Sequence, residues 1–76
     1  MREFVDGEGR KWDVVVGRES WGSVYALFIP ADQEGTLRQT LLATSSYQDA
    51  IQELQGASSS ELGRLLRQSE PKEMDG

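Results

Sequence analysis

The chain opens with two β-favouring runs on either side of the turn sequence Asp-Gly-Glu-Gly. This pattern is typical of a hairpin. A three-residue loop would place its last glycine where such a turn needs a left-handed backbone. That loop sets Asp6 opposite Arg10 and Phe4 opposite Trp12. The sequence therefore predicts a β-hairpin over residues 2–16.

Two further strands are expected before the pattern changes. Residues 23–29 form a largely apolar run that stops at Pro30, and residues 36–43 form a further candidate strand after a polar loop. Together with the hairpin they predict four strands. Because each connection is short, neighbouring strands are expected to pair antiparallel.

A first helix is predicted over residues 45–56, because apolar residues recur there at spacings of three and four. The members of this stripe are Tyr47, Ala50, Ile51 and Leu54. Ser45 or Ser46 can cap the start of this helix, and Gly56 is a natural C-terminal stop.

A second helix is predicted over residues 57–68, where Ser58 and Glu61 fit a capping box. Its apolar stripe consists of Leu62, Leu65 and Leu66. The expected fold is α+β, ββββαα, with the two C-terminal helices packed on one face of a four-stranded antiparallel sheet. Residues 1–70 would form a single domain, and residues 71–76 a flexible tail.

The turn between Gly17 and Gly22 decides which residues of the next strand face the helices, because a change of one residue in register exchanges the two faces. An even loop joins Trp12, Val14 and Val16 to Tyr25, Leu27 and Ile29. An odd loop joins them to Val24, Ala26 and Phe28 instead. A three-residue odd loop prefers glycine or asparagine at its third position, where this chain has Ser20, so the even loop is favoured.

With the even loop, the sheet face without helices carries a continuous apolar strip, and such a strip on a small domain indicates a contact surface. The residues predicted to mediate protein interaction are Val15, Trp21, Val24, Ala26, Phe28 and Leu42. The expected function is a non-enzymatic protein-interaction domain that forms a homodimer or docks on a protein partner through this face. Trp21 has two interpretations, as a lid over the end of the core and as an anchor for the partner.

The composition argues against most catalytic chemistry. The 76 residues include no cysteine and no histidine, which removes disulfides, thiolate ligands and the commonest general base. We therefore expect no enzyme activity, metal, cofactor or small-molecule substrate. No apolar run is long enough for a membrane span and no signal-peptide pattern opens the chain, so a cytoplasmic location is expected.

The alternative function is binding of single-stranded nucleic acid on the sheet face. Arg2, Lys11 and Arg38 would lie around an aromatic residue there, as in single-strand binding platforms. The net charge of −5 opposes this function, because phosphate binding needs local positive charge.

The two ends of the chain resemble those of short uncharacterised bacterial proteins. The shared features are an aromatic–acid–turn–Gly-x-x-Trp hairpin at the start and a leucine-rich helix at the end. The matching positions are Phe4, Asp6, Gly9, Trp12, Leu62, Leu65 and Leu66. The resemblance implies a self-contained bacterial domain and no particular activity.

Overall fold

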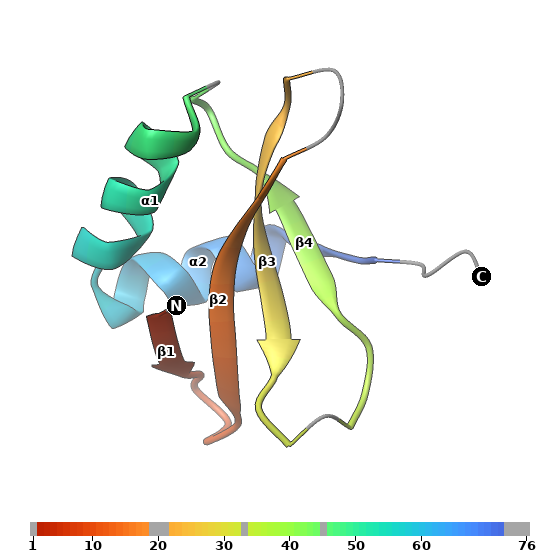
Figure 1. The fold of residues 1–76 in the computed structure, drawn as a ribbon. Helices are drawn as coiled ribbons and strands as arrows, with labels where there is room; N and C mark the ends of the chain where they lie inside the picture. The colour runs from red at the N-terminus through yellow and green to blue at the C-terminus, as the bar shows by residue number, and fades with distance from the viewer. Residues whose placement is uncertain (1, 19–21, 33, 45, 73–76) are drawn as a thin grey trace.

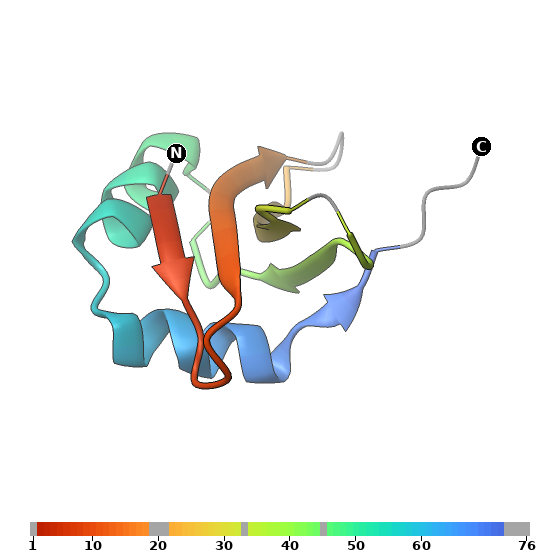
Figure 2. The same cartoon turned by 90° about the horizontal axis from the view of Figure 1, so that it is seen from below.

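The computed structural model describes residues 2–18, 22–32, 34–44 and 46–72. It is an α+β fold with an antiparallel meander of five strands and two helices (Figure 1). The elements in chain order are β1 (Arg2–Val5), β2 (Lys11–Arg18), β3 (Val24–Pro30), β4 (Arg38–Leu41), α1 (Tyr47–Gly56), α2 (Ser59–Gln68) and β5 (Glu70–Pro71). Viewed from below, α2 runs across the strands on one side of the sheet, and α1 lies beside β1 and β2 (Figure 2).

The predicted N-terminal hairpin is confirmed, with Phe4 opposite Trp12. The Asp6 N–H donates to the Arg10 carbonyl at 2.9 Å, and Gly9 has a φ of 86°, the left-handed value that favours glycine. The Asp6 side chain completes the turn, because its Oδ1 accepts the N–H groups of Glu8 and Arg10, both at 2.9 Å. Its Oδ2 accepts the indole N–H of Trp12, also at 2.9 Å.

The favoured register of the next hairpin is wrong. Arg18 pairs with Val24 and Val14 with Phe28, so the connection spans residues 19–23 and contains an odd number of residues. The two faces of β3 are therefore the reverse of those expected, so the residues predicted for the core lie on the opposite face. Val24, Ala26 and Phe28 are fully buried, whereas Tyr25, Leu27 and Ile29 lie half-buried on the opposite face.

One core joins the sheet to both helices. Phe28 lies at its centre, with edge-to-face contacts to Phe4 and Trp12 at centroid distances of 6.5 and 6.4 Å. The buried hydrophobic residues are Phe4, Trp12, Val14, Val24, Ala26, Phe28, Leu42, Ala50, Leu54, Leu62 and Leu65. Both predicted helical stripes thus contribute to the core, through Ala50 and Leu54 of α1 and through Leu62 and Leu65 of α2.

The helix starts follow the predicted caps. The Ser46 hydroxyl accepts the Asp49 N–H at 3.3 Å, and the Ser58 hydroxyl accepts the Glu61 N–H at 3.1 Å. These hydroxyls satisfy N–H groups that have no partner within the helix, which stabilises each first turn.

The sheet has five strands, so the expectation of four is corrected. After α2 ends, Glu70 and Pro71 pair with Gln39 and Arg38 of β4, and the Lys72 N–H donates to the Leu37 carbonyl at 2.7 Å. Proline has no N–H and is therefore compatible with an edge strand. The segment 71–76, predicted as a tail, thus begins with residues that pair with the sheet.

Candidate interaction surfaces

The sheet face that points away from the core carries a row of apolar side chains. Figure 1 shows α2 behind β2 and β3, with no described helix in front of them. We call this surface the open face, and its apolar members are Val5, Val15, Tyr25, Leu27, Ile29 and Leu41. Val5 and Leu41 are 54% and 58% exposed, and the other four are half-buried by their neighbours.

Leu27 covers the only glycine of β2, Gly17. A Cβ atom at Gly17 would lie 2.9 Å from Leu27 Cδ1, which is closer than van der Waals contact. Part of the Leu27 side chain is therefore packed onto the β2 backbone. This packing explains how a leucine on a face without helices remains half-buried.

The register places the predicted interaction residues differently from the expectation. Val15 lies on the open face, as predicted. The assignment of Val24, Ala26, Phe28 and Leu42 to that face is wrong, because Val24, Ala26 and Phe28 are fully buried and Leu42 is 5% exposed. Trp21 lies outside the described residues. The sequence analysis did not place Tyr25, Leu27 and Ile29 on the open face. It assigned them to the core because it favoured an even number of residues in the same loop.

The three basic residues of the predicted nucleic-acid platform do not converge. Lys11 lies on the open face, where its Nζ is 3.8 Å from a carboxylate oxygen of Glu3. Arg2 lies on the helix side and donates to the Ala57 carbonyl at 3.0 Å. Arg38 also lies on the helix side and donates to Ser69 Oγ at 2.8 Å and to its carbonyl at 2.6 Å.

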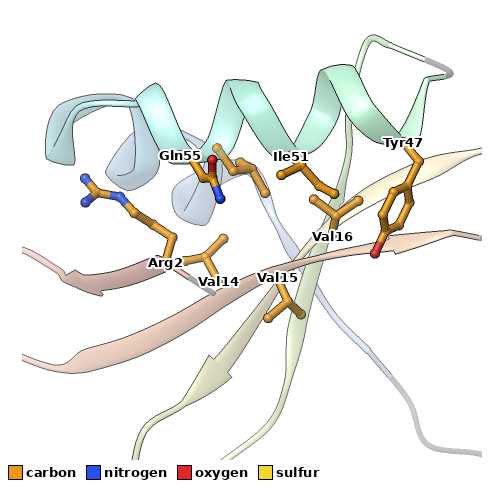
Figure 3. Close-up of a pocket in the computed structure, with 8 residues that line it drawn as sticks. Arg2, Val14, Val15, Val16, Tyr47, Ile51 and Gln55 are labelled. Carbon is orange, nitrogen blue, oxygen red and sulfur yellow. The ribbon is translucent and has the colours of Figure 1, made fainter.

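A separate groove of about 470 Å³ lies between β2 and α1 (Figure 3). Its lining consists of Val14–Val16 of β2, four residues of α1 and Arg2 at one end. The α1 residues are Tyr47, Ile51, Leu54 and Gln55. We call this hollow the edge groove. In Figure 3, Val14, Val16 and Ile51 point into the space between strand and helix, and Val15 points away from it.

The edge groove lies beside the part of β2 that extends beyond its described pairing with β1. The last described pair between these strands is Arg2 with Val14, so residues 15–18 of β2 have no described strand beside them on that side. The Arg10 carbonyl faces β1 and the Lys11 carbonyl faces β3, since they accept the N–H groups of Asp6 and Ala31 respectively. Backbone groups alternate in direction along an antiparallel strand, so those of Val16 and Arg18 point toward the free side.

No family model, curated protein or solved structure matches this chain.

The Asp6 carboxylate organises the turn of the first hairpin. Within residues 2–18, 22–32, 34–44 and 46–72, no group of three or more histidine, cysteine, aspartate or glutamate side chains is placed to hold a metal ion. The Trp12 indole hydrogen bond, together with the N–H groups of Arg10 and Glu8, holds the pKa of Asp6 below its ordinary value, against an opposing effect of desolvation. Neither described helix is long and apolar enough to cross a membrane.

Proposed function

We propose that this protein is a non-enzymatic interaction domain that self-associates through its open face. The observation that carries the proposal is the row of six apolar side chains on a sheet face that no described helix covers. Small soluble domains rarely expose a contiguous apolar surface without a partner.

The charges at the rim of the open face favour a second copy of the chain as the partner. Glu3, Lys11 and Asp13 lie side by side there, since Glu3 pairs with Asp13 across β1 and β2, and the Lys11 ammonium lies near Glu3. A twofold axis brings the same patch of two copies together. In such an arrangement Lys11 of one copy can face the acidic pair of the other, so the rim is self-complementary in charge.

The size of the face predicts a weak dimer. Two stacked sheets pack about 10 Å apart and interdigitate their side chains. If each copy covers about 400 Å², the gross hydrophobic gain is about 20 kcal/mol. The entropy lost on association consumes about 4–15 kcal/mol of it, and side-chain ordering consumes more. We therefore expect association in the micromolar range.

Sedimentation velocity between about 5 and 500 μM tests the proposal. The wild-type chain should shift from monomer to dimer, and the double variant Ile29→Lys/Leu41→Lys should remain monomeric, because it buries two charges in the contact. The matched control is Gln52→Lys/Ser60→Lys, which adds the same charge at two exposed positions on the helices and should dimerise as before. A strictly monomeric wild-type chain at the highest concentration would refute the proposal.

A further inference from the structure

Three features meet at the edge groove: backbone groups that face a side without a described strand, an apolar lining, and local positive charge. The backbone groups of Val16 and Arg18 face a side on which no described strand lies beyond the pair Arg2 and Val14, so an added strand could pair with them there. The apolar side chains of Val14, Val16 and Ile51 line the space beside that free strand (Figure 3). Extended peptides bind in this way to other sheets, with backbone hydrogen bonds for affinity and pockets for alternate side chains.

The groove is also locally basic in an acidic protein. Arg2 belongs to the lining at one end. Arg18 is not part of the lining but lies next to it, since its guanidinium carbon is 5.8 Å from the centroid of the ring of Tyr47, which belongs to the lining. Because Arg2 pairs with Val14, about 13 Å of strand separates the two positions. The lining contains no carboxylate among the described residues.

The nearest acidic residues of α1 point elsewhere. Asp49 and Glu53 are two positions from Ile51 in the helix, which turns them by about 160° from the side that lines the groove. Both are exposed. At physiological salt, charges are screened beyond about 8 Å, so the local arginines outweigh the net charge of −5 for a ligand seated in the groove.

We propose that the edge groove binds an extended segment of a partner protein, which adds to the sheet antiparallel to β2. A ligand side chain opposite Val16 enters the apolar groove. The ligand side chain opposite Arg18 lies on the same face, two residues earlier in the ligand, and is acidic. The recognised sequence is thus an acidic residue, any residue, and then an aliphatic residue. This site is distinct from the open face and does not rest on the self-association proposed above.

The recognition can be tested with a phage-displayed library of random heptapeptides selected on the wild-type chain. We expect enrichment of peptides with the acid-x-aliphatic pattern. A synthetic copy of an enriched peptide should then shift the backbone amide NMR signals of Val16 and Arg18 and the side-chain signals of Ile51. Binding should weaken as salt is raised, because the contact to Arg18 is ionic.

Variants at Arg18 test whether the positive charge of this residue contributes to peptide binding in the edge groove. Arg18→Glu should reduce the affinity for the enriched peptide roughly tenfold, and Arg18→Gln should reduce it less, since it removes the charge without reversing it. Arg64→Glu changes the net charge by the same amount as Arg18→Glu, but at an exposed position of α2 outside both the edge groove and the open face, and should bind within about twofold of wild type. Dispersed NMR spectra of all three variants establish that each is folded.

Several results would overturn this inference. They are an absence of enriched peptides, enrichment without the acidic residue, equal binding by Arg18→Glu, or peptide-induced shifts confined to Leu27 and Ile29 of the open face. The inference is also wrong if dilution without peptide shifts the Val16 and Arg18 signals, because the edge would then be paired with a second copy. None of these results bears on dimerisation through the open face, which sedimentation measures separately.

Discussion

Phe28 lies directly opposite Val14 across β2 and β3, and this pairing places both side chains in the core. The next residue, Ile29, pairs with Asp13 and lies on the open face. Two adjacent residues of similar hydrophobicity therefore lie on opposite faces of the sheet, Phe28 in the core and Ile29 on the open face.

Replacing Phe28 should remove most of the stability of this domain. Phe28→Ala deletes a fully buried ring that contacts Phe4 and Trp12, and we expect a loss of about 3–5 kcal/mol in the free energy of unfolding. The matched control, Ile29→Ala, should cost about 1 kcal/mol, because that side chain is only half-buried. Urea denaturation of both variants measures the difference. Equal losses would contradict the register.

The contact between Gly17 and Leu27 predicts a coupled pair. Gly17→Ala introduces a Cβ atom 2.9 Å from Leu27 Cδ1, so the leucine must leave its position at a cost of about 1 kcal/mol. In a Leu27→Ala background the same change should stabilise the protein by about 0.5–1 kcal/mol, since alanine is preferred to glycine in a strand. A double-mutant cycle by thermal denaturation gives the coupling energy. Additive effects would show that the two positions do not touch.

Asp6 should make the stability of the first hairpin depend on pH. Its pKa in the folded state is lowered, chiefly by the Trp12 hydrogen bond, so its stabilising effect is present above the unfolded pKa. That effect is lost as the pH falls through the folded value, below about pH 4. Asp6→Asn should cost about 1–3 kcal/mol at pH 7 and should flatten the loss of stability on acidification.

Glu8→Gln provides the control for Asp6, because it removes an exposed carboxylate from the same turn. The free energy of unfolding of Asp6→Asn should still decrease to some extent on acidification, because the pKa of Asp32 is also lowered, chiefly by the Glu34 backbone N–H. Unfolding measured from pH 2 to 7 tests both expectations. An unchanged acid profile for Asp6→Asn would show that the carboxylate does not hold the turn.

Arg38 should act as a structural link between β4 and the end of α2. Its two hydrogen bonds to Ser69 hold the residue that leads from α2 into β5. Arg38→Ala should cost about 1.5–3 kcal/mol and increase hydrogen exchange at Lys72, whose N–H bonds to Leu37. Arg38→Lys should recover little of this loss, because lysine lacks the planar guanidinium group that donates two hydrogen bonds to Ser69 at once. Arg64→Ala, which removes an exposed ion pair with Glu61, should cost less than about 0.5 kcal/mol.

The local elements of this fold could be predicted from the sequence because each rests on nearby residues. The first hairpin depends on the Asp-Gly-Glu-Gly turn, and the helices depend on Ser46, Ser58 and their apolar stripes. The fifth strand could not be predicted, because Glu70 and Pro71 have little strand preference of their own. They pair with β4 only because Arg38 and the end of α2 bring them beside it.

The sequence by itself determined that β3 is apolar on both faces, and hence that one apolar face would remain outside the core. It did not determine which face, because hydrophobicity is similar for Tyr25, Leu27 and Ile29 and for Val24, Ala26 and Phe28. Only the tertiary structure decided this, through the odd connection of residues 19–23 and the packing of Phe28 between Phe4 and Trp12. The edge groove has the same origin. It lies where the described pairing of β1 with β2 reaches no further than Arg2 and Val14, and where α1, distant in sequence, packs beside the rest of β2.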